Sequence, residues 1–253
     1  MGTTIAVTGK GGVGKTAFSA LTVLALVEHG WRPVLAVDAD PNLNLDAALG
    51  MKVEETVGGV RERITEQRSN TQSGMTATEL LELRIRQSLV EGEGFDLIAM
   101  GRPEGPGCYC YANEILRNVV DRLTGEYKAL VIDCEAGLEH FSRRTTGNLD
   151  MMFVLSDPTV RGLQTARRAL DLLTEVRTSV ANVKVVLNRV RGEPPADLIA
   201  AAEALGLTVD YWLPDDQYVA ELDARGRPLA ELSDDSPFRR EVARLLADCG
   251  LVS

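Results

Sequence analysis

The feature that most constrains this chain is a glycine-rich octapeptide near its N-terminus, Gly9-Lys10-Gly11-Gly12-Val13-Gly14-Lys15-Thr16. It fits the phosphate-loop pattern G-x-x-x-x-G-K-[ST] in full. A short apolar, β-rich run over residues 4–8 precedes it, and residues 17–28 behind it repeat apolar side chains at helical spacing. Strand, loop and helix in this order are the context that the pattern requires. The octapeptide therefore predicts a nucleoside triphosphate site in an α/β fold.

Each residue type in this loop suits one part of a bound triphosphate. Glycines allow successive backbone N–H groups to turn toward phosphate oxygens, and the N-terminus of the following helix adds positive potential. Lys15 is expected to reach the β- and γ-phosphates, and the hydroxyl of Thr16 to bind Mg²⁺. The expected contacts with ATP or ADP here are Gly9, Lys10, Gly11, Gly12, Val13, Gly14, Lys15, Thr16 and Ala17. The alternative is a glycine-rich turn that binds nothing.

Length and charge limit what else the chain does. Its 253 residues suffice for one large domain with a substantial core. The formal net charge of −10 argues against broad nucleic-acid binding, because neutralising phosphates needs clustered Lys and Arg. No run approaches the 18 or so apolar residues of a membrane span, so no stable membrane insertion is expected. The chain begins directly with a strand, and its four cysteines do not resemble a secreted disulfide framework, so we expect a cytoplasmic protein.

Further apolar runs predict a single α/β domain over 1–253, with a mostly parallel central sheet flanked by helices. Strands are expected at 33–37, 95–100, 128–133, 151–155 and 183–187, and helices at 79–89, 112–123, 160–177 and 236–246. Residues 49–93 are the hardest to interpret: they form either a partner-facing insertion or a long crossover.

Carboxylates follow two of the expected strands. Asp38 and Asp40 come directly after 33–37, and Asp133 ends 128–133. In a parallel sheet these positions face the ligand crevice. Asp133 therefore has the character of a Walker B carboxylate, which holds Mg²⁺ directly or through water. Asp38 and Asp40 have a second interpretation as a helix-start cluster, because Asp favours N-caps.

Lys10 is one lysine more than a phosphate loop needs. The string K-G-G-V-G-K-T resembles the deviant loop of the dimeric ATPases of the nitrogenase iron protein and MinD/ParA superfamily. The resemblance implies a homodimer in which Lys10 contacts the nucleotide of the partner subunit, with Lys15 acting within its own subunit. It also implies that Asp40 activates the attacking water and that Asp38 lies near Mg²⁺ or its waters. Otherwise Lys10 is a solvated loop charge.

The same resemblance extends to later segments. Residues 134–140 look like switch II, where the N–H of Gly137 would meet the γ-phosphate; the alternative is an ordinary turn glycine. Asn188 matches the position that hydrogen-bonds adenine, although an Asn at a strand end is more often a cap or turn. Pro214 and Asp215 match, more weakly, the segment along the other side of the base.

Cys108 and Cys110 flank one tyrosine in a Gly/Pro-rich loop. Two thiolates are soft metal donors but cannot complete a tetrahedral site. A two-fold dimer that brings this loop to its axis supplies four sulfurs, enough for Ni²⁺, Zn²⁺ or an iron–sulfur cluster shared between subunits. A vicinal redox pair and two incidental thiols are the alternatives.

Residues 107–114, G-C-Y-C-Y-A-N-E, look like the C-x-C segment of the CooC-type nickel-insertion ATPases. The resemblance implies an ATP-hydrolysing dimer that binds nickel through Cys108 and Cys110 and inserts it into carbon monoxide dehydrogenase. Cys134 departs from that family, where a non-thiol residue is common. Three alternatives stay open: a MinD/ParA-type ATP-switched spatial regulator, an iron–sulfur carrier, and a nickel donor to acetyl-CoA synthase.

The last expected helix, 236–246, has two interpretations. Ser236 caps it, Pro237 takes its first position, and its apolar residues share one face. MinD-type proteins end in a membrane-targeting helix. A helix packed on the sheet is the interpretation we favour for so short a stretch of mixed charge.

Overall fold

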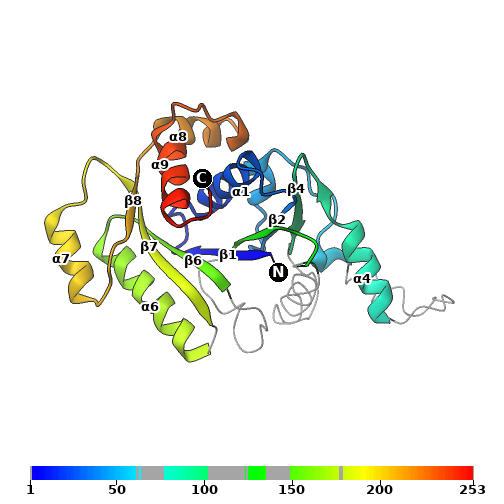
Figure 1. The fold of residues 1–253 in the computed structure, drawn as a ribbon, viewed down its shortest axis with the longest axis horizontal. Coiled ribbons are helices and arrows are strands. Elements are labelled where there is room, and N and C mark those ends of the chain that lie inside the picture. The colour runs from blue at the N-terminus through cyan, green and yellow to red at the C-terminus, as the bar shows by residue number, and fades with distance from the viewer. Residues whose placement is uncertain are drawn as a thin grey trace.

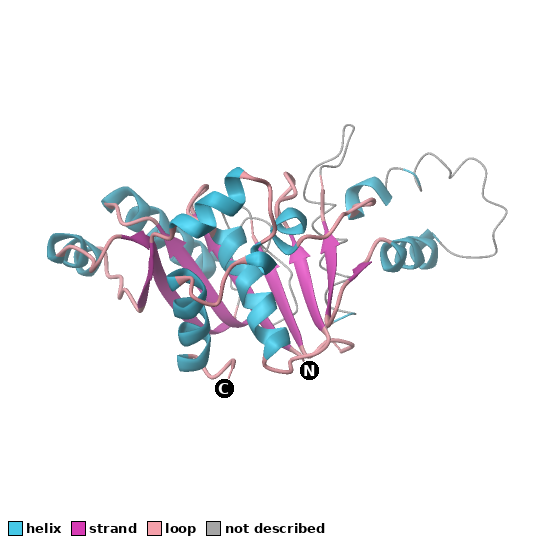
Figure 2. Cartoon of the chain, turned by 90° about the horizontal axis from the view of Figure 1, so that it is seen from above, coloured by secondary structure: helices cyan, strands magenta, loops and turns pink. Residues whose placement is uncertain are grey.

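The computed structural model of this chain describes residues 2–60, 63, 77–101, 123, 125–134, 149–176 and 179–252. Its centre is an eight-stranded sheet in the order β3-β4-β2-β5-β1-β6-β7-β8 (Figure 1). Every pair of neighbouring strands is parallel except β3 and β4. Helices cover both faces of the sheet (Figure 2). The predicted fold class is confirmed.

The expected strands and helices that lie within the described residues are present in the expected order. The strands are β1 Thr3–Gly9, β2 Val34–Asp38, β3 Val90–Glu91, β4 Phe95–Ala99, β5 Ala129–Asp133, β6 Leu149–Ser156, β7 Val180–Val190 and β8 Tyr211–Pro214. The helices are α1 Lys15–Glu28, α2 Leu45–Leu49, α4 Ala77–Gln87, α6 Val160–Val176, α7 Ala196–Ala204, α8 Gln217–Ala224 and α9 Pro237–Asp248, with a 3₁₀ turn at Leu229–Glu231. Of these, α2, β3, α7, β8 and α8 were not predicted.

Two hydrophobic cores lie on opposite faces of the sheet. Successive strand residues point to opposite faces, so Ile5 and Val7 of β1 enter one core while Ala6 enters the other. The first core is covered by α1, α2 and α9, and the second by α4, α6 and α7. Because both faces are covered, the central strands are apolar on both sides. That is why they read in the sequence as uninterrupted apolar runs.

The C-terminal helix α9 belongs to the first core. The hydroxyl of Ser236 accepts a hydrogen bond from the N–H of Arg239, and Pro237 takes the first helical position. The apolar residues of α9 are buried: Phe238, Val242, Leu245 and Leu246. The prediction of a helix packed on the sheet is therefore confirmed. Among the residues that the structure describes, no helix is long and apolar enough to cross a membrane.

The region from residue 49 to 93 is a crossover in its described parts. The helix expected over 79–89 is α4, and it is followed by β3, whose Val90 pairs antiparallel with Leu97 of β4. A strand of two residues has too little alternation to be found in a sequence. The helix expected over 112–123 lies outside the described residues except for its last position.

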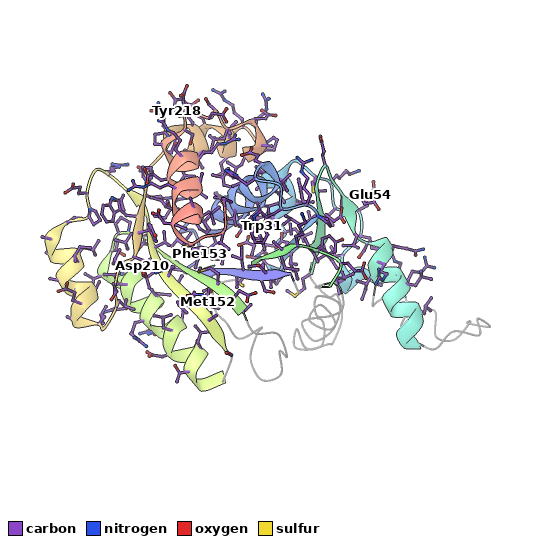
Figure 3. The ribbon with its side chains drawn as sticks, in the orientation of Figure 1. Trp31, Glu54, Met152, Phe153, Asp210 and Tyr218 are labelled. Carbon is purple, nitrogen blue, oxygen red and sulfur yellow. The ribbon has the colours of Figure 1, made fainter. Side chains whose placement is uncertain are left out.

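Phe153 tests the packing between helix and sheet. It lies on β6 beside Met152 (Figure 3), is fully buried, and meets Phe18 of α1 edge to face with ring centroids 5.0 Å apart. We expect Phe153→Ala to lower the free energy of unfolding by about 3–5 kcal/mol, because it removes this contact and leaves a cavity. Urea unfolding measures it. Tyr218→Ala, at a side chain that is 49% exposed, should change stability by less than about 0.5 kcal/mol. A loss below about 1 kcal/mol at Phe153 would contradict the packing.

Candidate nucleotide site

The phosphate loop connects β1 to α1 as the sequence predicts. β1 ends at Gly9 and α1 begins at Lys15. Gly9 has φ 145°, and a Cβ there would lie 2.1 Å from the carbonyl oxygen of Leu155, so no other residue fits. Gly14 caps α1 with φ 89° and no side-chain hydrogen bond. The first N–H groups of α1 are therefore not satisfied by a capping side chain, which suits an anion.

Lys15 folds back over this loop. Its side chain is almost fully buried, and its Nζ donates to the carbonyl oxygen of Lys10 at 3.2 Å. The ammonium group is thus held inside the loop. Contact of Lys15 with the terminal phosphates stays a prediction.

Asp133, at the end of β5, joins the loop to the sheet. Its Oδ2 accepts a hydrogen bond from the hydroxyl of Thr16 at 2.7 Å, and its Oδ1 accepts one from Ser19 at 3.1 Å. Burial raises the pKa of Asp133 to about 7, against the opposing effect of these hydrogen bonds. A hydroxyl and a carboxylate in contact are the oxygen donors that Mg²⁺ prefers, so Thr16 and Asp133 fit the predicted ion. Ser19 was not predicted, although its i+3 spacing from Thr16 places both on one helix face.

Asp38 ends the neighbouring strand and lies opposite Asp133 in the register of β2 and β5. Its carboxylate is fully buried and accepts three backbone hydrogen bonds at 3.0 Å, from the N–H groups of Asp40, Asn44 and Leu45. Burial raises its pKa, partly opposed by these hydrogen bonds. Asp38 therefore anchors the loop that leads into α2. Its role beside Mg²⁺ stays a prediction.

Asp40 lies in that loop and is partly exposed. Its Oδ1 accepts hydrogen bonds from the backbone N–H of Asn42 at 2.8 Å and from the Asn42 side chain at 3.0 Å. The loop thus fixes this carboxylate at the same edge of the sheet as Asp38 and the phosphate loop. Activation of water by Asp40 stays a prediction.

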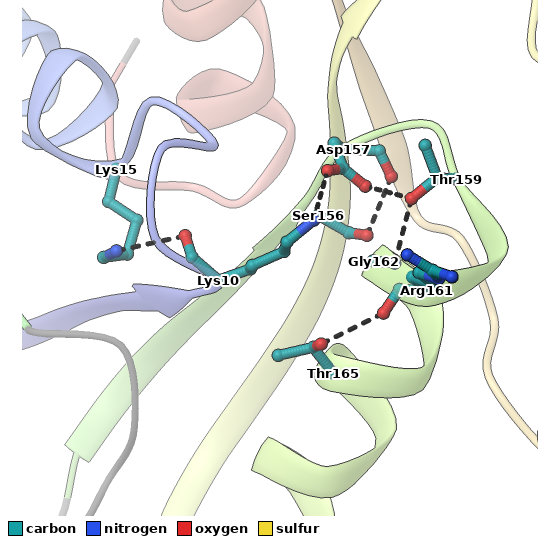
Figure 4. Close-up of polar contacts among 8 residues, drawn as sticks. All are labelled: Lys10, Lys15, Ser156, Asp157, Thr159, Arg161, Gly162 and Thr165. Atoms are coloured by element: carbon teal, nitrogen blue, oxygen red, sulfur yellow. Dashed lines mark hydrogen bonds and ion pairs between the residues drawn. The ribbon is translucent and has the colours of Figure 1, made fainter.

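Lys10 has a partner within its own chain. Its Nζ lies 3.0 Å from Oδ2 of Asp157, just past the end of β6 (Figure 4). The hydroxyl of Thr159 donates to the other oxygen of Asp157. Desolvation opposes ionisation of Asp157, but the hydrogen bonds from Thr159 and Lys10 prevail and lower its pKa. Asp157 was not predicted. The sequence feature that could have indicated it is its position directly after a parallel strand, where side chains face the ligand crevice.

The residues predicted to meet the base lie at the ends of β7 and β8. Asn188 is buried, and Pro214 lies opposite Val190 in the register of these strands. The N–H of Asp215 donates to the carbonyl oxygen of Val190 at 3.0 Å. The fold thus brings Asn188, Pro214 and Asp215 together at the carboxyl ends of β7 and β8, as expected. Contact with adenine stays a prediction.

Three predicted site residues, Cys108, Cys110 and Gly137, lie outside the described residues. Within the described ranges, no group of three or more His, Cys, Asp or Glu side chains is arranged to hold a metal. Cys134, the departure noted in the sequence, is buried, and burial raises the pKa of its thiol. A thiol in that environment is unreactive, so it adds nothing to the site.

Comparison with known proteins places this geometry in a family. The family of the CobQ/CobB/MinD/ParA nucleotide binding domain matches residues 4–229. An uncharacterized ATP-binding protein of Methanocaldococcus jannaschii is 44% identical over 95% of this chain and 96% of its own length. The carbon monoxide dehydrogenase accessory protein CooC of Rhodospirillum rubrum is 34% identical, over 81% of this chain and 88% of its own.

A solved structure shares the fold. The cell division ATPase MinD of Pyrococcus furiosus superposes with a TM-score of 0.72 over 99% of both chains, at 21% identity.

The ion pair of Lys10 and Asp157 should contribute little to folding. Their side chains are 43% and 27% exposed, so we expect Asp157→Asn to lower the free energy of unfolding at pH 7 by less than about 1 kcal/mol. Because the folded-state pKa of Asp157 is lowered, its contribution is present above the ordinary value of 3.8 and disappears as pH falls through the folded value. Urea unfolding of both proteins at pH 7 and below pH 3.8 tests this. A loss above 3 kcal/mol at pH 7 would assign the pair to the core instead.

Proposed function

Because this chain belongs to the CobQ/CobB/MinD/ParA family of nucleotide-binding proteins and is a P-loop ATPase, we propose that it is an ATP-driven metal-delivery dimer. In this proposal it binds nickel through Cys108 and Cys110 of two subunits and inserts the ion into a client nickel enzyme, carbon monoxide dehydrogenase. The observation that carries the proposal is the C-x-C pair in a chain with a complete phosphate loop.

The metal part of the proposal rests on donor chemistry. Two thiolates from one chain leave a tetrahedral or square-planar site half complete, and a symmetric dimer supplies the other half. The 34% identity with an accessory protein of carbon monoxide dehydrogenase supports that enzyme as the client. Nickel as the ion rests on the resemblance of residues 107–114 to the C-x-C segment of nickel-insertion ATPases. Nickel is then the cargo of the protein, taken up and released in each cycle.

The dimer part of the proposal rests on Lys10. A lysine that acts on the partner's nucleotide must leave its own subunit, and the side chain of Lys10 is 43% exposed at the start of the loop. In the single chain it is paired with Asp157. We therefore propose that closure of the dimer over two ATP molecules exchanges the carboxylate of Asp157 for the phosphates of the partner's nucleotide. The exchange replaces one anionic partner by another, so the charge of Lys10 is never left unpaired.

Hydrolysis is proposed to depend on groups at the ends of β1, β2 and β5. Lys15 and the N–H groups at the start of α1 bind the phosphates, and Asp40 orients the attacking water. Thr16 and Asp133 would hold Mg²⁺, which supplies charge neutralisation at the phosphates. Release of phosphate then frees Gly137, reopens the dimer and alters the thiolate site.

A MinD/ParA-type regulator is the second candidate, favoured by the fold shared with MinD of Pyrococcus furiosus. It predicts ATP-dependent association with a membrane or a nucleic acid, without a stoichiometric metal. The apolar face of α9 does not serve such a membrane contact, because its residues are buried against α1 and the sheet. The net charge of −10 likewise disfavours DNA.

The first experiment addresses the trans lysine. We expect Lys10→Ala to abolish ATP-dependent dimerisation and to lower kcat by about 100-fold or more, the effect of removing one charge-stabilising donor. Binding of ATP to the monomer should stay within a few-fold of wild type. Lys52→Ala, at an exposed lysine elsewhere, is the matched control. Asp157→Asn should shift dimerisation to lower ATP concentrations, since it releases Lys10. Normal hydrolysis by Lys10→Ala would refute the trans role.

The second experiment addresses the cargo. Ni²⁺ is titrated into reduced, anaerobic protein by calorimetry, with equilibrium sedimentation to count subunits. We expect one ion per dimer, lost in Cys108→Ser/Cys110→Ser and kept in Cys249→Ser, where a half-buried thiol outside the C-x-C pair is removed. Undiminished binding by the double variant would exclude the proposed site. A brown, iron-containing protein would instead favour the iron–sulfur carrier.

A further inference from the structure

Asn188 connects the base end of the site to the phosphate end. Its Nδ2 donates to the carbonyl oxygen of Val13 at 2.8 Å, and its Oδ1 accepts from the N–H of Arg189 at 2.8 Å. The side chain is 3% exposed. A backbone carbonyl only accepts and a backbone N–H only donates, so these two bonds permit a single orientation of the amide.

Both neighbours of this amide are shaped to receive it. A Cβ at Gly14 would lie 2.5 Å from Nδ2 of Asn188, so the glycine leaves the space that the amide fills. Arg189 has φ 61°, a left-handed conformation that is unusual for a residue with a side chain. Its N–H reaches Oδ1 of Asn188 in that conformation. Gly14 on one side and Arg189 on the other therefore both have the backbone conformation or the space that the Asn188 amide needs.

The bond to Val13 sets the direction of a phosphate-loop N–H. The carbonyl of Val13 and the N–H of Gly14 belong to the same peptide unit, which is planar and trans, so they point in opposite directions. When Asn188 holds the carbonyl on one side, the N–H of Gly14 points to the other side. Gly14 is the N-cap of α1 and has no side-chain cap. Its N–H is therefore one of the free N–H groups at the start of the helix that can bind a phosphate oxygen.

We propose that Asn188 is a positioning residue for the phosphate loop: it orients the peptide between Val13 and Gly14 for polyphosphate binding, whether or not a base is bound. After its two bonds the amide keeps one N–H and one acceptor position, which suit the edge of adenine. One side chain thus links recognition of the base to the geometry of the phosphates. This inference rests on the proposed nucleotide site and adds a role that a pure base contact lacks.

The test separates the two roles with a ligand that has no base. The affinities of Asn188→Ala for inorganic tripolyphosphate and for ATP, both with Mg²⁺, are measured by calorimetry. We expect both dissociation constants to rise by a similar factor, about 10-fold, as for loss of a buried hydrogen bond. The matched control is Asn182→Ala, which removes an Asn on the same strand that donates to the carbonyl oxygen of Asp150 at 3.2 Å. It should change neither constant.

A second measurement uses the nucleotide-free protein. Amide hydrogen exchange over residues 11–16 should be faster in Asn188→Ala than in wild type, while exchange over α6 stays the same. If the alanine variant does not fold, Asn188→Ser takes its place, since its shorter hydroxyl does not span the distance to Val13. Unchanged tripolyphosphate affinity with a lost preference for ATP over GTP would make Asn188 a base reader only and overturn the proposal. So would an equal loss in Asn182→Ala. Failure of the wild-type chain to bind ATP would instead refute the proposed function.

Discussion

The site depends on two buried carboxylates that end neighbouring strands. Asp38 and Asp133 lie opposite each other in the sheet, both nearly inaccessible to solvent, and burial raises the pKa of each. A buried anion is tolerable only where hydrogen bonds satisfy it. Backbone N–H groups do so for Asp38, and the hydroxyls of Thr16 and Ser19 do so for Asp133. The same hydrogen bonds hold the loop after β2 and the first turn of α1 in place. The need to satisfy two buried carboxyl groups therefore determines the backbone conformation around the site.

Most of the fold could be predicted because its signals are local. A complete phosphate loop between a strand and a helix, and apolar runs buried on both faces, are legible in short windows of sequence. The strand of two residues at Val90–Glu91 was not, since it is defined only by its pairing with β4. The same holds for α2, which begins where Asp38 bonds the N–H of Leu45. Elements that are stabilised mainly by tertiary contacts cannot be predicted from the sequence of their own residues.

The site shows the same division. Lys15, Thr16 and Asp133 were predicted from the motif and from the end of a strand, and the structure places Thr16 and Asp133 in hydrogen-bond contact and Lys15 against the carbonyl of Lys10. The partner of Lys10 was missed because Asp157 is 147 residues away and carries no motif of its own. The bond from Asn188 to Val13 was missed for a similar reason, at a separation of 175 residues. Which oxygen or carbonyl a side chain contacts is set by the register of the sheet, and a sequence does not display register.

The lengths of the outermost strands have a consequence for how copies of this chain associate. At one edge of the sheet β3 has only two residues, and at the other β8 has four and ends in Pro214, which has no N–H to offer. Short edge strands and proline are means by which proteins prevent the sheets of two molecules from pairing edge to edge into a continuous sheet. Extension of the sheet by a strand from another copy of the chain is therefore disfavoured at both edges. In the proposed dimer, the second subunit would approach at the strand ends where the phosphate loop lies, and a two-fold contact there is closed and does not extend into a fibre.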